Sequence, residues 1–394
     1  MEISRTRVLF SGMEWFPEHR DGGSNRYFYE QLQAMAAAGV AGEAMVSSAR
    51  PGRVGQIAVH GMAAGGARLI SRWRGARALA RRALDGGARV VNVHFALYAW
   101  PWLNLLSGTA PLIVTFHGPW AEEMRLASRT WSRRVLAIVA KNMEKRVYRR
   151  ADRVITLSEA FKKLIHEQYG VPLGSIRVIP GGIDLQRYLA APERAVARDR
   201  LGWPADRVIL LAVRRLTKRM GLDLLIEAVA GIRTEFPKVL LYIGGEGPES
   251  DALRTQIASK GLEEHVRLTG FLPEEDLPFA YAAADLSVVP TVALEGFGLV
   301  TAESLACGTP VLGTPVGGTP EVLMPLDRNL VFDAATPGAM ARRIGEVLRG
   351  SKQLPDRAAC RAYVKRYGWV EVLPKILSVY QEAIAERDGR TAAP

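Results

Sequence analysis

Short apolar runs alternate with stretches of helical periodicity along the whole chain, and this alternation narrows the folds that the sequence can adopt. In the first half we expect strands over residues 8–10, 44–46, 90–93, 112–116 and 153–156, with helices such as 24–38 and 132–150 between them. In the second half we expect strands over 208–213, 239–243, 266–269, 286–289 and 310–312, and helices over 221–232 and 249–260. Such alternation is typical of doubly wound parallel sheets. The sequence therefore predicts an α/β protein with two Rossmann-like domains.

The length of 394 residues agrees with two domains. A turn-rich segment over residues 179–184 marks a boundary, so we expect one domain over residues 1–180 and a second over 181–368. Residues 187–200 are expected to form a charged connecting helix, and residues 369–385 carry a helical apolar stripe that could pack on either domain. Ligands of open α/β sheets bind beyond the carboxyl ends of the strands. Two such domains that face a central cleft would suit a two-substrate transfer.

The composition is that of a soluble globular protein, with 48% hydrophobic and 23% charged residues. Apolar runs stay below the roughly 18 residues that cross a bilayer, and the first residues lack the core of a signal peptide. We therefore expect a cytoplasmic protein. The two cysteines, Cys307 and Cys360, suggest neither a disulfide framework nor a metal site. The sequence also has no Asp-x-Asp triplet, His-Glu-x-x-His motif or Walker A loop, so no metal is expected.

Positive charge is concentrated in the first half of the chain. The net charge is +12 overall, +14 over residues 1–200 and −2 over residues 201–394. This asymmetry suggests an anionic partner, although a basic solubilising surface explains it equally well. The segment from Arg68 to Arg89 resembles an interfacial helix for an anionic membrane surface, or else an ordinary amphipathic surface helix. Nucleic acid is not expected as a partner, because no recognised binding module accompanies the charge.

The most informative motif lies between Glu295 and Gly308. Gly296 and Gly298 permit a tight turn, and the residues from Gly298 onwards predict a short helix that stops at Gly308. A glycine turn before a helix points N–H groups and the positive dipole end outward, which suits a phosphate. Glu295 before the helix and Glu303 inside it could accept bonds from hydroxyls on the two sides of that phosphate. The motif favours a nucleotide-sugar, whereas two such acids alone are more often solvated surface charges.

A basic loop follows the first expected strand of the second half, with Arg214, Arg215, Lys218 and Arg219. Arginine forks and lysine charges suit a diphosphate whose charge grows as its bond to the sugar breaks. Taken alone, the loop is more simply a solvated basic turn. The segment Gly244-Gly245-Glu246-Gly247-Pro248 follows the next strand and could pass close to a nucleotide, although it lacks the Gly-x-Gly-x-x-Gly spacing.

Two histidines follow neighbouring strands of the first half. His117 would face the cleft, where it could hydrogen-bond a sugar hydroxyl, and His94 ends the preceding strand, so the two are candidate neighbours. A lone histidine at such a position is more often structural. The segment Asp21-Gly22-Gly23-Ser24 begins a helix, and its first or last residue could simply cap that helix. Its glycines could instead let backbone amides approach a phosphate or an acceptor, so Gly23 is a candidate donor-binding residue.

Together, these motifs resemble those of the family-four retaining glycosyltransferases, which have the GT-B fold. The resemblance extends over nearly the whole chain, from Asp21 to the helix after Trp369. Its most specific part is the segment from Glu295 to Glu303, followed by Cys307-Gly308-Thr309-Pro310-Val311. The supporting motifs are Gly181-Gly182-Ile183-Asp184, Arg215-Leu216 with Gly221, Gly245-Glu246-Gly247-Pro248 and Thr269-Gly270-Phe271.

The resemblance implies how a donor would be bound. Glu295 would bind hydroxyls of the donor sugar, Glu303 would bind the ribose, and backbone near Phe271 would read the base. The sugar and pyrophosphate would be lined by the backbone of Gly296, Phe297, Gly298 and Leu299.

The resemblance also implies that Arg215 neutralises the leaving diphosphate and that His117 contacts the donor sugar from the first domain. The family usually has a lysine directly before the glycine of the basic loop, where this chain has Met220. Lys218 or Arg219 would then supply the second cation. Such enzymes typically need no divalent metal or other cofactor, and their C-terminal helix, here residues 369–394, crosses back to complete the first domain.

The predicted function is retaining transfer of a hexose-type sugar from a UDP- or GDP-sugar to a lipid, a lipid-linked saccharide or a polysaccharide precursor. His117, Arg215 and Glu295 are the candidate catalytic residues. Two other functions stay open at this point: epimerisation or hydrolysis of the nucleotide-sugar, and binding without catalysis. The expected location is the cytoplasm, with peripheral attachment to the inner face of the plasma membrane as a further option.

Overall fold

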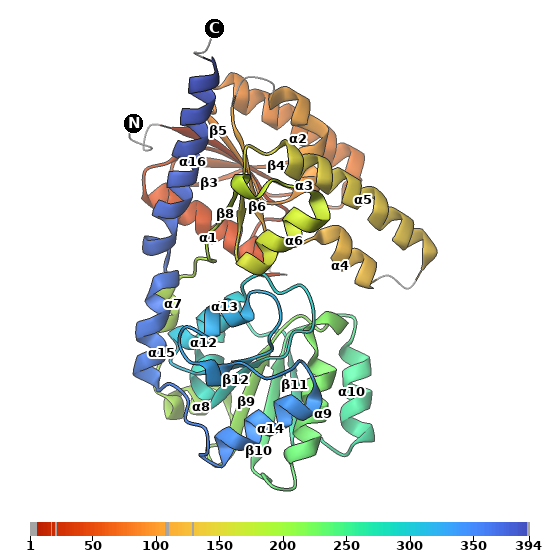
Figure 1. Ribbon diagram of the computed structural model, residues 1–394, viewed down its shortest axis with the longest axis vertical. Coiled ribbons are helices and arrows are strands. Elements are labelled where there is room, and N and C mark those ends of the chain that lie inside the picture. The colour runs from red at the N-terminus through yellow and green to blue at the C-terminus, as the bar shows by residue number, and fades with distance from the viewer. Residues whose placement is uncertain (1–5, 17, 20–21, 107–109, 128–129, 392–394) are drawn as a thin grey trace. The chain divides into compact units, whose positions relative to one another are not determined.

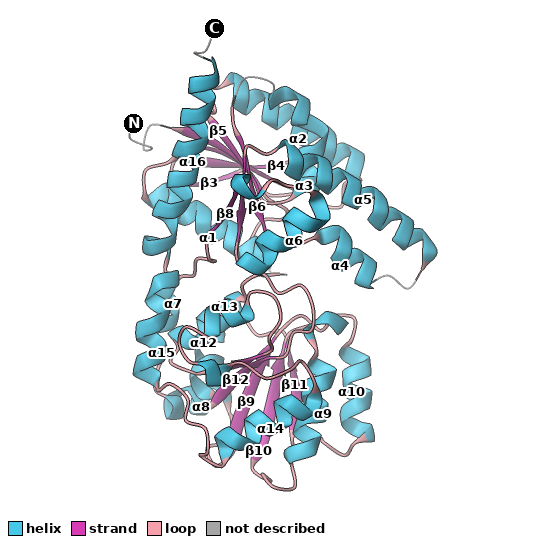
Figure 2. Ribbon diagram, in the orientation of Figure 1, coloured by secondary structure: helices cyan, strands magenta, loops and turns pink. Residues whose placement is uncertain are grey.

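A computed structural model describes residues 6–16, 18–19, 22–106, 110–127 and 130–391. The chain divides into two compact units, which are described separately (Figure 1). Unit 1 comprises the residues up to Gly182 and those from Trp369 onward, and unit 2 comprises Ile183–Gly368. Both units are sheets covered by helices (Figure 2). The predicted α/β class with two doubly wound sheets is therefore confirmed.

Unit 1 is built on an eight-stranded sheet with the order β3-β4-β2-β1-β5-β6-β7-β8. All neighbouring strands are parallel except β3, which runs antiparallel to β4 at the edge. The order reverses between β1 and β5, which makes this a doubly wound sheet. The strands are β1 (Arg7–Ser11), β2 (Ala41–Val46), β3 (Gly52–Val54), β4 (Ile57–Gly61), β5 (Val90–Val93), β6 (Leu112–Phe116), β7 (Arg153–Thr156) and β8 (Ile176–Val178).

Helices cover both faces of this sheet because its strands are apolar on both sides. Within β1, for example, Leu9 belongs to one buried cluster, while Val8 and Phe10 belong to the other. The first cluster includes residues of α2, α3, α5 and α6, and the second includes residues of α1 and α16. The helices are α1 (Gly23–Ala37), α2 (Leu69–Asp85), α3 (Ala96–Ala99), α4 (Trp120–Ala127), α5 (Trp131–Arg150), α6 (Glu159–Tyr169) and α16 (Trp369–Thr391).

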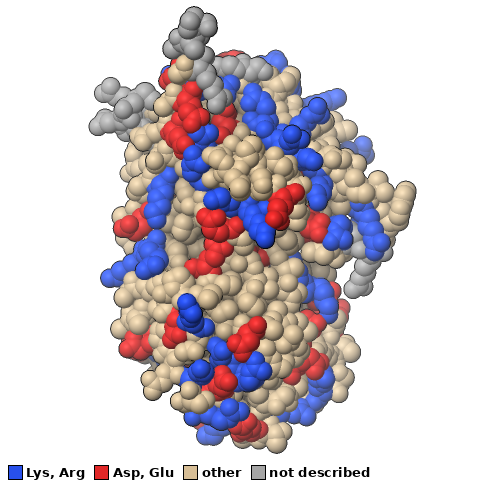
Figure 3. Space-filling view, viewed as in Figure 1, with Lys and Arg blue, Asp and Glu red and all other residues tan. Residues whose placement is uncertain are grey.

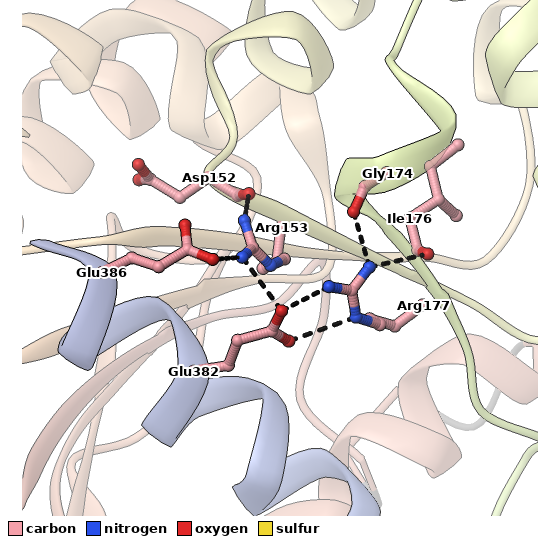
Figure 4. A network of polar contacts seen from close by, with 7 residues as sticks. All are labelled: Asp152, Arg153, Gly174, Ile176, Arg177, Glu382 and Glu386. Carbon is pink, nitrogen blue, oxygen red and sulfur yellow. Dashed lines mark hydrogen bonds and ion pairs between the residues drawn. The ribbon is translucent and has the colours of Figure 1, made fainter.

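The last helix, α16, packs on the sheet of unit 1 although it is far from that sheet in sequence. Its apolar stripe is buried in the core, with Val372, Ile376 and Tyr380 each at most 1% exposed. Ion pairs fasten its end, because Glu382 accepts hydrogen bonds from Arg153 on β7 and from Arg177 on β8 (Figure 4). Each fully buried large apolar side chain contributes about 1.5–3 kcal/mol. Apolar burial therefore contributes most of the free energy that attaches α16 to the sheet, and the ion pairs fix the position of its C-terminal part.

Unit 2 is built on a five-stranded parallel sheet with the order β11-β10-β9-β12-β13. The strands are β9 (Val208–Val213), β10 (Val239–Gly244), β11 (Val266–Gly270), β12 (Leu286–Val289) and β13 (Val311–Gly313). The order reverses between β9 and β12, so the loops after these two strands begin on either side of a switch point. That is where open α/β sheets bind their ligands.

Helices connect the parallel strands of this second sheet and pack against it. One face is covered by α9, α10 and α14, whose buried side chains include Leu225, Leu253 and Ile344. The helices of unit 2 are α7 (Leu185–Leu189), α8 (Arg194–Leu201), α9 (Leu222–Ile232), α10 (Ser250–Ser259), α11 (Leu277–Ala283), α12 (Leu299–Ala306), α13 (Thr319–Leu323), α14 (Pro337–Leu348) and α15 (Arg357–Val364).

The single connecting helix expected over residues 187–200 is wrong in detail. The structure has two helices there, α7 and α8, separated by a short break that contains Pro192. A proline disfavours helical backbone in the residue before it and cannot donate a hydrogen bond to the preceding turn. The helix α7 starts at Leu185, two residues earlier than expected, and Asp184 caps it by accepting a hydrogen bond from the Arg187 amide at 3.3 Å.

Candidate functional site

The loops that follow β9 and β12 meet at the switch point of unit 2. The Val292 amide donates a hydrogen bond to the Arg219 carbonyl at 2.9 Å, which ties the two loops together. Gly221 has a φ of 66°, and a Cβ at this position would lie 2.1 Å from the Pro290 carbonyl oxygen. Only glycine permits this approach. The basic loop and the Glu295 loop therefore form one packed structure.

Glu295 is held in a buried polar cluster. Arg214 Nη2 donates to Glu295 Oε2 at 2.7 Å, and the hydroxyl of Thr291 donates to the same oxygen at 2.9 Å. The arginine and glutamate side chains are only 7% and 9% exposed. The second carboxylate oxygen, Oε1, lies toward Gly298, where an added Cβ would stand 3.6 Å from it. The carboxylate is thus oriented by one charged and one neutral donor and directed toward the start of α12.

The four cations of the basic loop fall into two kinds. Arg214 holds Glu295, and Arg219 donates to the Leu294 carbonyl at 3.1 Å. Leu294 has a φ of 57°, the one positive value outside glycine in the described part of the chain, so Arg219 supports a strained turn. Arg215 and Lys218 are exposed instead. A hydrogen bond to Asp223 at 2.5 Å raises the pKa of Lys218 above its ordinary value, so this side chain stays charged.

The predicted short helix after the glycine turn is present as α12. Gly298 is its N-cap residue with a φ of 76°, and Leu299 is its first residue. Phe297 is buried and packs edge-on against Tyr367, with ring centroids 5.1 Å apart. The Phe297 side chain therefore contributes to packing inside unit 2. The backbone of this segment, from Gly296 to Leu299, is the part that could line a ligand, and its assignment to the donor stays a prediction.

Glu303 lies one turn further along α12 and is 1% exposed. Its Oε2 accepts a hydrogen bond from the Tyr281 hydroxyl at 2.9 Å. A buried carboxylate with neutral donors is costly unless further polar groups approach it. The role of Glu303 in binding a ribose hydroxyl stays a prediction.

A loop after β13 closes over the backbone of Glu295 and was not singled out by sequence reasoning. The Gly318 amide donates to the Glu295 carbonyl at 2.9 Å. Gly317 has a φ of 59°, and a Cβ there would lie 2.0 Å from the same carbonyl oxygen. The signal that could have identified this loop is a Gly-Gly pair that follows an expected strand after four residues, one of them a proline.

The glycine-rich segment after β10 serves close packing. Gly245 has a φ of 135°, and a Cβ there would lie 1.9 Å from the Arg214 carbonyl oxygen. Its amide donates to the Gly270 carbonyl at 2.7 Å, which brings the end of β11 alongside. Phe271 follows directly and is 39% exposed. The segment thus holds the Arg214 backbone in place and leaves an aromatic ring at the same sheet edge.

In unit 1 the two histidines are neighbours, as expected. His94 Nδ1 and His117 Nε2 are 2.8 Å apart, and His94 Nε2 lies 2.7 Å from the Asn92 side-chain oxygen. The amide of Asn92 is oriented by its own donation to the Ile113 carbonyl at 3.4 Å and to the Thr115 hydroxyl at 3.0 Å. Because Asn92 presents its oxygen, His94 carries its proton on Nε2 and accepts at Nδ1. His117 then donates from Nε2 and keeps an acceptor at Nδ1.

Burial keeps both imidazoles neutral. Desolvation lowers the pKa of His117 to about 4, and it lowers the pKa of His94 well below its ordinary value, with a further contribution from His117. Tyr27 packs edge-on against His117 with ring centroids 4.9 Å apart. Asn92 and the residues that orient it were missed by sequence reasoning, because a polar residue inside an apolar strand has no motif around it.

The first candidate phosphate loop of unit 1 is only partly described. Gly23 is the first residue of α1, and Gly22 is the N-cap residue with a φ of 84°. Ser24 lies within the first turn, so it does not occupy the cap position. Asp21 lies outside the described residues. The proposed role of Gly23 in donor binding therefore stays a prediction.

The described residues contain neither a candidate metal cluster nor a helix that could span a membrane. Among these residues no group of three or more His, Cys, Asp or Glu side chains could hold a metal ion. In the same ranges, every helix is too short or too polar to cross a bilayer.

Comparisons with known proteins identify similar chains for both units. The family model "Glycosyltransferase Family 4" matches residues 21–187, and "Glycosyl transferases group 1" matches residues 193–367. A GDP-mannose-dependent alpha-(1-6)-phosphatidylinositol monomannoside mannosyltransferase of Mycolicibacterium smegmatis is 30% identical over 75% of this chain and 83% of its own. A D-inositol 3-phosphate glycosyltransferase of Thermobispora bispora is 33% identical over 77% of this chain and 72% of its own.

Solved structures show the same fold at lower identity. A sucrose-phosphate synthase from Thermosynechococcus elongatus has a TM-score of 0.77 at 23% identity and covers 97% of this chain and 100% of its own. Anabaena HepE, solved in complex with UDP-glucose, has a TM-score of 0.73 at 20% identity and covers 98% and 99%. These likenesses concern the arrangement of the backbone.

Proposed function

Because this chain belongs to the group 1 glycosyltransferases of family 4, we propose that it transfers a hexose-type sugar from a nucleotide-sugar to a lipid-linked acceptor with retention at the anomeric carbon. Nucleotide-sugar use is supported by the name of the mannosyltransferase relative and by the UDP-glucose bound to HepE. One of the two relatives is named for phosphatidylinositol monomannoside and the other for D-inositol 3-phosphate. These names favour an acceptor with a phosphoinositol group. Transfer requires no divalent metal in this proposal.

The observation that carries the proposal is the packing at the switch point of unit 2. A buried carboxylate, Glu295, is oriented at the N-terminal end of α12, and Glu303 lies within the same helix. Exposed Arg215 and Lys218 follow the neighbouring strand. Carboxylates suit hydroxyl groups, whereas the helix start and the cations suit phosphate. A sugar diphosphate offers both kinds of group in one molecule.

In the proposed reaction the acceptor oxygen bonds to the anomeric carbon on the face from which the diphosphate departs. The bond between that carbon and the phosphate oxygen breaks, and the leaving phosphate takes the proton of the acceptor hydroxyl. Arg215, together with Lys218, neutralises the charge that develops on the diphosphate. Both candidates for the second cation have partners, since Lys218 bonds to Asp223 and Arg219 to the Leu294 carbonyl. Arg219 is the weaker candidate because its side chain is less exposed than that of Lys218.

The test compares Arg215→Ala with Arg254→Ala, an exposed arginine on α10 that pairs with Asp251. Loss of one charge-stabilising contact costs about 2–4 kcal/mol of barrier, which is a roughly 30- to 900-fold slower transfer. We expect Arg215→Ala to slow transfer by that amount with little change in melting temperature, and Arg254→Ala to change neither. Near-normal turnover in Arg215→Ala would refute the assigned role.

A thermal-shift panel of UDP-, GDP- and ADP-sugars identifies the donor, because a ligand that binds only the folded state raises the melting temperature. Incubation of that donor without an acceptor separates transfer from hydrolysis or epimerisation. Slow donor loss that accelerates with a phosphoinositol lipid is the expected result. Rapid turnover of the donor alone would contradict transfer, and donor binding without turnover across many acceptors would favour a binding protein.

A further inference from the structure

Large apolar side chains are exposed together on the paired helices α4 and α5 of unit 1. Trp131 is 80% exposed, Ile138 62% and Leu136 55%. We call this surface the α4–α5 tip, and its apolar members are Leu126, Trp131, Val135, Leu136, Ile138 and Val139. Scattered exposed apolar residues are ordinary, but six within two adjoining helices form a patch of the kind that marks a binding surface.

The outer half of α5 has an inverted burial pattern. In its first three turns the buried positions are the small residues Ala137 and Ala140, while the larger apolar residues face solvent. From Glu144 onward the pattern is ordinary, since Val147 and Tyr148 are buried. A water-exposed helix normally keeps its large apolar residues inside. The outer half of α5 is therefore built for contact with another apolar phase, and the inner half anchors it to unit 1.

Exposed cations lie within the tip and along the rest of α5. Arg133 and Arg134 stand among its apolar residues, and the inner half of α5 adds further exposed cations: Lys145, Arg146, Arg149 and Arg150. The single acid of α5, Glu144, is buried. Figure 3 shows blue side chains beside a largely tan surface at the outer end of α5. On the adjoining α4, Glu122 is paired with Arg125 at 2.5 Å. The charge complementary to this surface is negative.

We propose that the α4–α5 tip docks unit 1 onto an anionic lipid surface. The apolar side chains would enter the boundary between headgroups and acyl chains, and the arginines would contact lipid phosphates. Trp131 at the outer end suits the interfacial layer, because its ring is apolar and its N–H is polar. This docking does not depend on the proposed transfer reaction and can be measured without donor or acceptor.

The structure favours this surface over α2, which lies within the segment from Arg68 to Arg89 suggested by the sequence. Along α2, Trp73, Leu79 and Leu84 pack against the core, and only Leu69 and Ile70 are exposed large apolar residues. Three of its five arginines also donate hydrogen bonds within the protein. Arg72 donates to Tyr98, Arg77 to Asn104 and Arg82 to Glu43.

The experiment is co-sedimentation of the full chain with vesicles of phosphatidylglycerol and phosphatidylcholine in a 1:1 ratio, and with pure phosphatidylcholine. The test variant is the double substitution Leu136→Asp with Ile138→Asp. One control is Val196→Asp, which places a single aspartate at an apolar residue 58% exposed on α8 of unit 2. A second comparison, Leu69→Asp with Ile70→Asp, places two acids on α2. Circular dichroism and analytical ultracentrifugation establish folding and oligomeric state for each variant.

We expect the wild type and the Val196 control to sediment with the anionic vesicles, with binding that weakens as salt rises. The Leu136/Ile138 variant should bind at least tenfold more weakly, and Arg133→Glu with Arg134→Glu should lose the preference for anionic lipid. If the Leu136/Ile138 variant misfolds, the arginine pair alone decides the outcome.

Wild type that stays in the supernatant at low salt would overturn the proposal. Equal binding by the tip variants would also do so, as would loss of binding only in the α2 variant. A wild-type dimer in solution that the Leu136/Ile138 variant dissolves would show instead that a second copy of the chain covers the tip.

Discussion

The buried carboxyl group of Glu144 makes the stability of unit 1 depend on pH in a way that one substitution isolates. Glu144 is 3% exposed on α5. Its oxygens accept hydrogen bonds from the Tyr169 hydroxyl at 2.8 Å, the Tyr148 hydroxyl at 3.3 Å and the Ala121 amide at 3.4 Å. These donors lower its pKa, but burial dominates and raises the pKa to about 7. The native state therefore holds a proton that the unfolded chain releases near pH 4.5.

The size of the effect follows from the difference between these two pKa values. Each unit of pKa difference corresponds to about 1.4 kcal/mol, so the shift amounts to roughly 3 kcal/mol of unfolding free energy. Because the folded pKa of Glu144 is raised, its favourable contribution is complete below pH 4.5. That contribution is lost as pH rises from 4.5 to about 7, and it is constant above that.

Glu144→Gln removes this titration and keeps the size of the side chain. The difference in unfolding free energy, variant minus wild type, should therefore rise by roughly 3 kcal/mol between pH 4.5 and 7.5. The neutral histidines His94 and His117 act in the opposite direction. Their folded pKa values are lowered, so their contribution is present above pH 6.5 and is lost as pH falls toward 4. Both proteins share these histidines, so the difference cancels them.

The measurement is hydrogen exchange of peptides from β6 and α5 at increasing urea concentrations, at four pH values between 4.5 and 7.5. Glu122→Gln serves as the control on the neighbouring helix, because a hydrogen bond from Arg125 lowers the pKa of Glu122. Its difference curve should be small and of opposite sign. A constant difference between Glu144→Gln and wild type across this pH range would refute the assignment of the buried proton to Glu144.

Three further predictions concern the polar cluster around Glu295 in unit 2 and the histidine pair in unit 1. Arg214→Met should lower the free energy of unfolding by about 3–5 kcal/mol, because it leaves the Glu295 carboxylate buried without its cation. Urea unfolding measures this change, and a variant as stable as wild type would contradict the ion pair. Gly317→Ala should shift the Glu295 backbone and abolish the thermal shift produced by donor, whereas Gly338→Ala, where a Cβ meets open space, should leave that shift unchanged. His94→Phe should lower kcat more than it raises KM, since His117 loses its acceptor and its fixed tautomer; an effect on KM alone would argue against a positioning role.

Much of the fold follows from patterns that are local in sequence. The apolar runs at residues 8–10 and 208–213 each became a central strand, because buried parallel strands are apolar on both faces. The strands β3, β4 and β8 were not anticipated. Two of them have only three residues, and β3 and β8 form the edges of the sheet, where the apolar pattern is weak.

The candidate site was predictable where motifs are contiguous and unpredictable where contacts are distant. The turn and helix around Glu295 and the adjacency of His94 and His117 follow from strand ends and spacing. The pairing of Arg214 with Glu295 does not, because 81 residues separate them and Arg215 beside it carries the same charge. Successive side chains at the end of a strand point to opposite sides, so Arg214 is directed toward Glu295 and Arg215 toward solvent.

The position of α16 has a consequence for synthesis on the ribosome. The chain emerges from its N-terminus, so the strands of unit 1 and α1 are complete long before α16, which covers the same face of the sheet as α1, has been made. Until then, the buried cluster that contains Val8, Phe10 and Ile155 lacks Val372, Ile376 and Tyr380, which belong to it in the finished molecule. Nascent unit 1 must therefore wait for the whole of unit 2 to be translated, and a shortened product that stops near residue 368 would present an open apolar face to chaperones and proteases.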